Sequence, residues 1–377
     1  MYDVIVVGAG PVGSYTASRL AKLGFKVAIF EEDKSVGENV ICTGIIGKEI
    51  FERFNLPQEA VLSRVKSVSF FSPSLLSVEY KPSDTLAYVV DRGIFDRDAL
   101  AYAVKNKVEV HLNSRVEKIK IEEDFVQVEV REDSCSKKIG AKAVVLSTGV
   151  NYRLQQDLGM GSPPAFFQGA QVEAELEALE QTEIYLGREV CPGSFAWVVP
   201  LNNFKARVGV LANSRGAFYL KNFLQKCLQE RIKEKSLSIS QKRIAYGPIP
   251  KSFTHRVLAV GEAGGQTKTT TGGGIAYGLL CSEIAVDVLK ESFNRGDFSE
   301  RRLSKYEKLW RSKIGKELKI GCDVRKIMGK ITDKQIDKVF KFLQRRKGLK
   351  RLIERRVNFD YHSGFLSLGL KALKRFV

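Results

Sequence analysis

The sequence predicts an α/β fold with α+β character, built from a Rossmann-type parallel sheet, an antiparallel sheet and a helical C-terminal region. Residues 2–32 run from a strand through a glycine turn into a helix and a second strand, which is the pattern of a βαβ unit. Residues 165–212 are rich in strand-forming and aromatic residues. From residue 301 on, apolar side chains recur at helical spacing among many Lys and Arg residues.

The first unit has the sequence YDVIVVGAGPVGSYTASRLAKLGFKVAIFEE. Each of its glycines has a physical role. Gly8 permits a tight turn, Gly10 lets the backbone approach a pyrophosphate, and Gly13 lets the helix pack close to the strand. The free amides at the start of the helix attract phosphate groups. Glu31 follows the second strand, where a carboxylate accepts hydrogen bonds from a ribose hydroxyl. Because strand, helix and acid are all in place, a dinucleotide site is favoured over a glycine turn without a ligand.

The composition is that of a globular chain long enough for two domains. Of its 377 residues, 44% are hydrophobic, and we expect no membrane span because no run of about 18 apolar residues lacks charge. Because a strand is predicted from residue 2 on, we expect no signal peptide. The six cysteines and three histidines are scattered, so we expect no metal site, no disulfide framework and a cytoplasmic location. The cysteines are Cys42, Cys135, Cys191, Cys227, Cys281 and Cys322.

A loop of small residues follows the first unit and carries Cys42 and Thr43. It is either a close approach of backbone to a cofactor ring or a loop with one buried thiol. Residues 65–90 alternate and contain two turns, which predicts antiparallel strands inserted into the nucleotide-binding unit. Arg92 then opens a helix, and its side chain is either free to reach a phosphate or on the surface.

Further strands are predicted at residues 108–112, 116–121 and 125–131. A buried strand at 141–150 ends in Thr148 and Gly149, which suits another close approach of backbone to a cofactor.

A second strand, small-residue loop and helix occupy residues 257–290. Glu262 follows the strand, where an acid is placed to hold a second sugar hydroxyl. Gly272, Gly273 and Gly274 lead into a helix whose free amides would face an electron-rich ring edge. Because two such turns lie some 250 residues apart, we expect one extended dinucleotide, FAD, across both.

Together these motifs resemble the FAD domain shared with para-hydroxybenzoate hydroxylase. The resemblance covers residues 1 to about 300 and rests on GAGPVG with Glu31, the DRGIFD segment, Ser147-Thr148-Gly149 and Gly261-Glu262-Ala263. Glu262 stands where the family usually has Asp, which should keep the hydrogen bond. The residues expected to bind the cofactor are Gly8, Gly10, Val12, Gly13, Glu31, Cys42, Thr43, Arg92, Val116, Thr148, Gly149, Glu262, Gly273, Gly274 and Ile275.

The segment CPGSFAWVVP, residues 191–200, is similar to the P-x-x-Y-x-W-x-F-P signature of the geranylgeranyl reductase family. Phe195 replaces the family's Tyr and Val199 replaces its Phe, while Trp197 matches. Cys42 and the TGGGI segment also resemble that family, of the digeranylgeranylglycerophospholipid reductase type. An ordinary sheet strand with aromatic packing is the alternative for residues 191–200 taken alone.

The resemblance implies reduction of isolated C=C bonds in a polyprenyl chain, on a lipid or a prenyl diphosphate, by hydride from reduced flavin. Phe195, Trp197 and Val199 would form an apolar slot that holds the isoprene units against the ring. Loss of the tyrosine hydroxyl leaves its polar role in doubt, and Val199 widens the slot. No residue is assigned as the proton donor.

Two other functions remain open at this point. Flavin-dependent monooxygenases and halogenases are an alternative, since halogenases carry W-x-W-x-I-P, but this chain lacks the first tryptophan. A flavoprotein that passes electrons at a membrane without catalysis is the third possibility.

The positive charge is concentrated near the C-terminus. The net charge is +18, and from residue 301 on the chain holds 24 Lys and Arg against 7 Asp and Glu. The stripe Leu303, Tyr306, Trp310, Ile314 and Leu318 predicts helices packed on the body. Residues 345–377, basic with Leu and Phe, predict an anionic membrane surface as partner and a peripheral location on the inner face of the membrane. Nucleic acid is not expected, because no nucleic-acid-binding fold accompanies the charge.

The electron donor is expected to be NADPH or reduced ferredoxin, and the oligomeric state is left open. The predicted domains are a discontinuous FAD-binding domain, an antiparallel-sheet substrate domain and a basic helical region. Their residues are 1–64, 85–160 and 245–300 for the first, 65–84 and 161–244 for the second, and 301–377 for the third.

Overall fold

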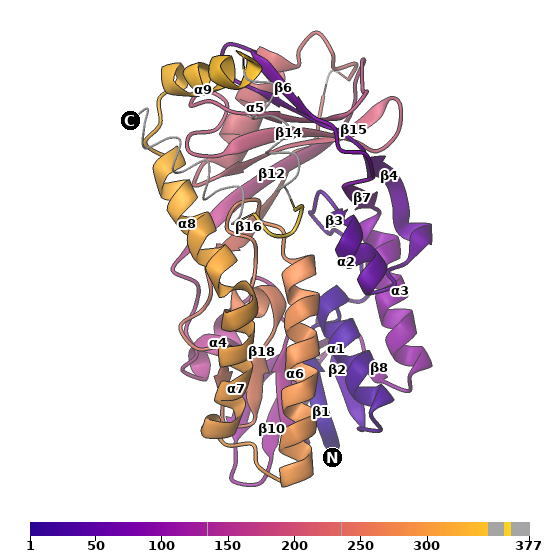
Figure 1. The fold of residues 1–377 in the computed structure, drawn as a ribbon. Coiled ribbons are helices and arrows are strands. Elements are labelled where there is room, and N and C mark those ends of the chain that lie inside the picture. The colour runs from indigo at the N-terminus through magenta and orange to yellow at the C-terminus, as the bar shows by residue number, and fades with distance from the viewer. Residues whose placement is uncertain (134, 235, 346–357, 363–377) are drawn as a thin grey trace.

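The fold is given by a computed structural model, which describes all residues except 134, 235, 346–357 and 363–377. Figure 1 shows two halves, with a parallel sheet and its helices below and a large sheet above. The C-terminal helices run along one side from the lower half to the upper.

The lower sheet has eight strands, and its central strands β11, β1, β2 and β8 are parallel, which confirms the predicted Rossmann-type sheet. Strand β18 adds in parallel to β11, and β17, β10 and β9 are antiparallel to their neighbours. The strands are β1 (Tyr2–Val7), β2 (Val27–Phe30), β8 (Glu109–His111), β9 (Ser114–Ile121), β10 (Val126–Glu132), β11 (Cys135–Leu146), β17 (Phe253–Thr254) and β18 (Val257–Ala259).

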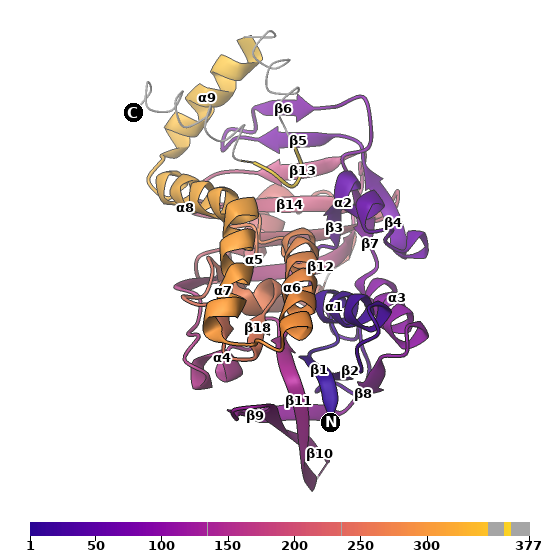
Figure 2. The same ribbon diagram turned by 60° about the horizontal axis from the view of Figure 1, so that its bottom comes forward.

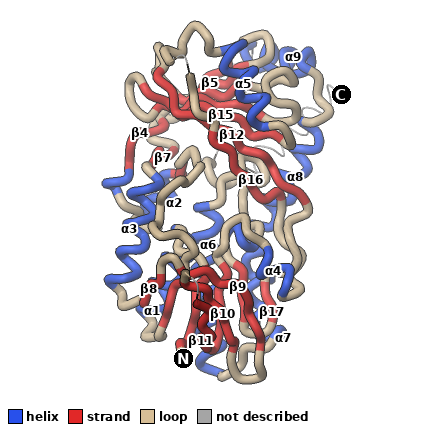
Figure 3. The backbone as a smooth tube through the Cα atoms, turned by 180° about the vertical axis from the view of Figure 1, so that it is seen from behind, coloured by secondary structure: helices blue, strands red, loops and turns tan. Residues whose placement is uncertain are grey.

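Strand β1 is buried on both faces, which explains its continuous run of apolar residues. Val4 and Val6 pack with the helices on one face, while Ile5 and Val7 pack against β10 and the region of α4 on the other. Figures 1 and 3 show α6 and α7 on the first face and β9 and β10 on the opposite side. The helices are α1 (Pro11–Lys22), α2 (Lys48–Arg53), α3 (Arg92–Lys105), α4 (Arg153–Asp157), α5 (Gly216–Cys227), α6 (Ile275–Arg295), α7 (Glu300–Trp310), α8 (Lys316–Met328) and α9 (Asp333–Arg345).

The upper sheet has seven strands in the order β16-β12-β15-β14-β13-β5-β6, part of which is visible edge to edge in Figure 2. Helix α5 packs on β12 and β15. The strands are β16 (Ser240–Tyr246), β12 (Ala165–Glu175), β15 (Lys205–Ala212), β14 (Phe195–Pro200), β13 (Thr182–Tyr185), β5 (Val68–Phe71) and β6 (Ser77–Tyr80).

Two details differ from the prediction of an antiparallel insert at residues 65–90. Strand β5 pairs with β6 in antiparallel fashion, but on its other side it pairs with β13 in parallel. In addition, the insert is divided between sheets: β7 (Ala87–Val90) forms a small antiparallel sheet with β3 (Ile45–Gly47) and β4 (Val61–Val65). At the other boundary, β16 continues to Tyr246, two residues beyond the expected end of the upper segment.

The C-terminal stripe packs on the body of the protein, as predicted. Leu303, Tyr306, Trp310, Ile314 and Leu318 are all at most 3% exposed and belong to the core of the lower half. Helix α9 packs across β6, with Ile336 and Phe340 buried against the upper sheet. The predicted membrane-facing segment, residues 345–377, lies almost wholly outside the described residues, which include only 345 and 358–362 of it.

Candidate functional site

The first glycine turn has the geometry that a dinucleotide requires. Gly8 has φ +102°, and a Cβ on Gly13 would lie 2.0 Å from the Gly8 carbonyl oxygen, so α1 approaches β1 more closely than any side chain permits. A Cβ on Gly10 would meet no atom within 4 Å. The turn is therefore tight on its protein side and open at Gly10, which fits a pyrophosphate at the start of α1.

Glu31 holds this turn in place from the end of β2. One oxygen of its carboxylate accepts from the Ala9 amide (2.7 Å) and the other from the Asp33 amide (3.0 Å). Burial raises the pKa of Glu31 above its ordinary value, although the two amides act in the opposite direction. The carboxylate lines the cavity described below, so its predicted contact with a ribose hydroxyl is geometrically open.

The second turn, at the start of α6, packs directly on the first. The side chain of Val12 on α1 fits against Gly261 and Gly278, where added Cβ atoms would come within 3.0 and 2.4 Å of it. The Thr16 hydroxyl also donates to the Ser282 hydroxyl (2.9 Å). Turns some 250 residues apart in sequence are thus joined through α1 and α6.

One cavity of about 1120 Å³ contains every residue proposed from the sequence. The cofactor candidates in its lining are Gly8, Gly10, Val12, Gly13, Glu31, Cys42, Thr43, Arg92, Val116, Thr148, Gly149, Glu262, Gly273, Gly274 and Ile275, and the slot candidates are Phe195, Trp197 and Val199. The volume is above the range of about 300–1,000 Å³ for ordinary ligand pockets. It has room for a dinucleotide and a second ligand.

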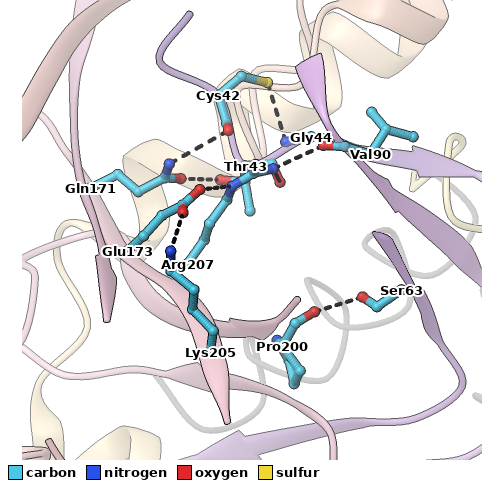
Figure 4. Close-up of polar contacts among 10 residues, drawn as sticks. All are labelled: Cys42, Thr43, Gly44, Ser63, Val90, Gln171, Glu173, Pro200, Lys205 and Arg207. Carbon is cyan, nitrogen blue, oxygen red and sulfur yellow. Dashed lines mark hydrogen bonds and ion pairs between the residues drawn. The ribbon is translucent and has the colours of Figure 1, made fainter. Parts of the chain in front are cut away.

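Figure 4 shows how the Cys42 loop is fastened to the upper sheet. Arg207 on β15 donates through Nη1 to the carbonyl oxygens of Thr43 (3.0 Å) and Val90 (2.9 Å), and through Nε to Glu173 (3.0 Å). The Thr43 hydroxyl donates to Gln171 Oε1 (3.0 Å). Arg207 is 7% exposed, so the loop is held by a buried cation that the sequence analysis did not single out.

Positive charge surrounds the thiol of Cys42. Burial raises its pKa, but the charges of Arg92 and Lys242 outweigh burial and leave the pKa below that of an ordinary thiol. Arg92 itself makes a bidentate contact with Asp96 through Nε (2.9 Å) and Nη2 (2.8 Å). Asp96, one turn further along α3, therefore occupies the Nε and Nη2 positions of Arg92, and contact of Arg92 with a phosphate stays a prediction.

Glu262 has protein partners as well. Its carboxylate lies 3.4 Å from Lys242 Nζ and accepts weakly from the Ala245 amide (3.4 Å). Its backbone carbonyl accepts from the Tyr152 hydroxyl (2.5 Å). Contact with a cofactor hydroxyl remains a prediction for this residue.

The three slot residues share one face of β14. Phe195, Trp197 and Val199 line the cavity, while Ala196 and Val198 face the core beneath α5. Beyond them the cavity continues as an apolar trough between the upper sheet and helices α8 and α9. The trough residues include Val68, Phe70, Val78, Ile184, Leu186, Val324, Met328, Phe340 and Leu343.

A short C-terminal segment, residues 358–362, completes the wall near the second turn. Asp360 pairs with Lys268 (2.5 Å), and both side chains are at most 6% exposed. His362 contacts the Thr270 hydroxyl through Nδ1 (2.8 Å), and the Tyr277 hydroxyl donates to the Asp360 carbonyl (2.9 Å). The sequence analysis missed these contacts, since no local pattern links residue 268 to residue 360.

Among the helices of the described residues, none has the length and apolar character needed to cross a membrane. Within the same residues, no group of three or more His, Cys, Asp or Glu side chains is arranged to hold a metal ion.

Comparisons with known proteins identify the family of this chain. Residues 2–167 match the family model described as pyridine nucleotide-disulphide oxidoreductase. The chain is 31% identical over 351 residues to the digeranylgeranylglycerophospholipid reductase of Methanocaldococcus jannaschii, covering 89% of both chains. It is 30% identical over 350 residues to digeranylgeranylglycerophospholipid reductase 1 of Methanococcoides burtonii, covering 89% of this chain and 86% of that protein.

Solved structures show the same fold. A geranylgeranyl bacteriochlorophyll reductase-like protein from Thermoplasma acidophilum superimposes with a TM-score of 0.86 at 22% identity, covering 99% of both chains. A flavin-dependent brominase superimposes with a TM-score of 0.75 at 14% identity, covering 100% of this chain and 98% of that one.

The paired glycine turns, the open backbone at Gly10 and the shared cavity define an FAD-dependent oxidoreductase. Within that class, the chain belongs to the geranylgeranyl reductase family, which includes the digeranylgeranylglycerophospholipid reductases. The family resemblance stated from the sequence is thereby confirmed.

Proposed function

We propose that this protein saturates isolated C=C bonds of a polyprenyl chain, such as a geranylgeranyl chain on a lipid or a prenyl diphosphate. The observation that supports the proposal best is the apolar trough, which leads away from the two glycine turns within the same cavity. A long, flexible hydrocarbon is the ligand that such a lining favours, because burial of its surface supplies the binding energy. The names of the relatives support the same substrate class.

The task of the protein in this reaction is mainly positioning. FAD, when bound and reduced, would supply the hydride, and an unactivated alkene offers little charge for the protein to stabilise. Phe195 and Trp197, whose ring centroids are 5.9 Å apart, would hold one isoprene unit in place. Such orientation alone is worth several orders of magnitude in rate.

The proton for the second alkene carbon is proposed to come from the thiol of Cys42. This thiol lines the cavity beside Arg92 and Lys242, which lower its pKa. A lowered pKa makes a thiol a better proton donor as long as the pH stays below it. The loop that carries the thiol is fixed by hydrogen bonds from Arg207 to the Thr43 and Val90 carbonyls and from the Thr43 hydroxyl to Gln171. The contacts of Arg207 are called the Arg207 clamp below.

The decisive experiment is anaerobic. Purified FAD-loaded protein, reduced with dithionite, is incubated with a geranylgeranyl lipid, and mass spectrometry counts the added pairs of hydrogen. Trp197→Ala should abolish turnover with flavin still bound, while Trp197→Phe should retain part of it. An unchanged lipid with the wild-type protein would refute the proposal.

The two alternatives differ in simple ways. A halogenase or monooxygenase consumes oxygen, and a halogenase also consumes halide, whereas the proposed reaction proceeds without either. The brominase neighbour at 14% identity indicates a common fold and nothing more. For a non-catalytic electron carrier, photoreduced flavin would show no reoxidation on addition of a prenyl substrate.

An anionic membrane surface and an electron donor are the proposed partners. A prenyl-lipid substrate makes an anionic membrane surface the natural location for residues 345–377, on the inner face of the membrane. Their net positive charge equally suits docking of an acidic ferredoxin, and NADPH is the other electron donor to be tested.

A further inference from the structure

The cations that line the cavity are almost all neutralised by neighbouring carboxylates. Five of them have a carboxylate oxygen within 4.0 Å, and Arg325 is the one for which the described residues provide none. The paired ones are Arg92 with Asp96, Arg115 with Glu32, Arg153 with Asp157, Lys242 with Glu262, and Lys268 with Asp360.

Arg325 projects from α8 into the wall of the cavity and is 8% exposed. Its Nε donates to the Thr269 carbonyl (3.3 Å) and its Nη1 to the Gly193 carbonyl (3.0 Å). Its guanidinium carbon lies 4.3 Å from the centre of the Phe167 ring. Nη2 is buried and has no partner among the described residues, and burial lowers the pKa of Arg325 to about 10.

Arg256 shows that these features are not simply those of a buried arginine. It is also 8% exposed, but Nε, Nη1 and Nη2 all donate to the carbonyl oxygens of Glu123 and Lys142. It does not line the cavity. The unpaired nitrogen and the position in the cavity wall therefore distinguish Arg325.

A buried charge without a counter-ion is costly for a protein, and a ligand that brings an anion removes that cost. The surroundings indicate which kind of anion. Val324 and Met328, on the same helix, line the apolar trough. The indole Nε1 of Trp197 is a second buried donor of this cavity without a partner. A hydrophobic trough beside a single uncompensated cation is complementary to an amphiphile with one acidic group.

We propose that Arg325 binds the phosphate ester group of the prenyl substrate and so makes the enzyme select acidic prenyl compounds over neutral ones. The inference rests on the proposed function. Arginine is suited to this role because its planar fork donates two hydrogen bonds to one phosphate. Nη2 is enclosed, so its engagement requires a neighbour to move. The Phe195 ring, centred 5.9 Å from the guanidinium carbon, is the neighbour that also lines the slot.

The test compares ligands that share one hydrocarbon chain. Binding of geranylgeranyl diphosphate, geranylgeranylglyceryl phosphate and neutral geranylgeraniol is measured by calorimetry with FAD-loaded wild-type protein. We expect at least one phosphorylated ligand to bind about 10- to 100-fold more tightly than the alcohol. The stronger of the two identifies a free diphosphate or a lipid phosphate as the source of the anion.

Three variants test whether Arg325 causes the preference for phosphorylated ligands. Arg325→Met should bring the phosphorylated ligands to the affinity of the alcohol and leave alcohol binding unchanged or stronger. Arg325→Lys should retain part of the preference, because it keeps the charge and loses the fork. Arg256→Met, the matched buried arginine away from the cavity, should keep the full preference. Flavin absorbance and melting temperature report whether each variant is folded and loaded.

The outcomes separate this inference from the proposed function. Equal affinity of wild-type protein for all three ligands would overturn the role of Arg325 while leaving prenyl reduction intact. A preference that survives in Arg325→Met would overturn it as well. If none of the three ligands binds or is reduced, it is the prenyl reductase function itself that fails.

Discussion

Removal of the Arg207 clamp is the perturbation whose effect follows most directly from the structure. In Arg207→Met, the carbonyl oxygens of Thr43 and Val90 lose the donor that holds them at 3.0 and 2.9 Å. A hydrogen bond to a charged group contributes about 1.5–3 kcal/mol. Glu173 is 40% exposed, so water solvates its carboxylate after the change. We therefore expect a loss of about 3 kcal/mol or more in unfolding free energy, mostly from the two carbonyl groups.

Lys205 provides a matched control on the same strand. Its Nζ pairs with the same Glu173 at 3.3 Å, but its side chain is 43% exposed. An exposed ion pair of this kind contributes about 0–1 kcal/mol, so Lys205→Met should be nearly neutral. Arg207 and Lys205 lie two residues apart and both pair with Glu173, so each variant removes one positive charge from the same place. Only Arg207 also donates to the carbonyl oxygens of Thr43 and Val90.

Two assays measure the effect of the Arg207 clamp on the loop that carries Cys42. Melting temperatures of FAD-free and FAD-loaded protein give the stability, and flavin fluorescence titration gives the FAD affinity. We expect Arg207→Met to raise the FAD dissociation constant at least tenfold, which corresponds to about 1.4 kcal/mol, because the Cys42 loop lines the cofactor cavity. If Arg207→Met and Lys205→Met behave alike in both assays, the assignment of the clamp is incorrect.

Four further predictions concern other parts of the cavity. Gly13→Ala should destabilise the fold by at least about 2 kcal/mol, because its Cβ would lie 2.0 Å from the Gly8 carbonyl. Gly10→Ala should leave the melting temperature of FAD-free protein unchanged and weaken FAD binding, since only the ligand side is open; thermal melts and titration distinguish the two. Reduction by wild-type protein should decline as pH rises through the lowered pKa of Cys42, and Cys42→Ser should remove that pH step, as steady-state rates would show. Burial, and then the charge of Lys268, lower the pKa of His362 from 6.5 to about 4. The neutral ring therefore favours folding above pH 6.5, and this contribution to stability is lost as the pH falls toward 4. In thermal melts, His362→Gln should make the melting temperature depend less on pH on the acid side.

The sequence was sufficient for the parts of the fold that depend on local patterns. The glycine turns, Glu31 and the alternation along residues 195–199 were identified because turn geometry and strand periodicity leave a local imprint. The separation of β5 and β7 into different sheets was not, because their pairing with β13 and with β3 and β4 depends on long-range contacts. An alternating strand carries no information about which neighbour it joins.

The contacts of the charged groups in the site were even harder to predict from the sequence. Arg92 was identified from its position at a helix start, but its pairing with Asp96 was not anticipated, although the spacing of four residues on a helix favours such a pair. Arg207, Lys268 and Arg325 were missed altogether. Each has a contact with a residue at least 56 positions away, and a lone basic residue in a strand, loop or helix is usually a surface residue.

The C-terminal region contributes to the core and to the cavity as well as carrying most of the positive charge. Its charge suggested a membrane-surface role for residues 345–377 only, and four described parts of the region from residue 301 on act inside the protein. The α7 stripe completes the core of the lower half, Arg325 and Met328 on α8 line the cavity, Phe340 on α9 closes the trough, and Asp360 neutralises Lys268. Buried groups of this kind cannot be removed without exposing apolar surface and unpaired charge. Truncation before α8 would therefore impair the cavity itself, and membrane binding has to be tested with charge-reversing substitutions among the Lys and Arg residues of 345–377 rather than by deletion.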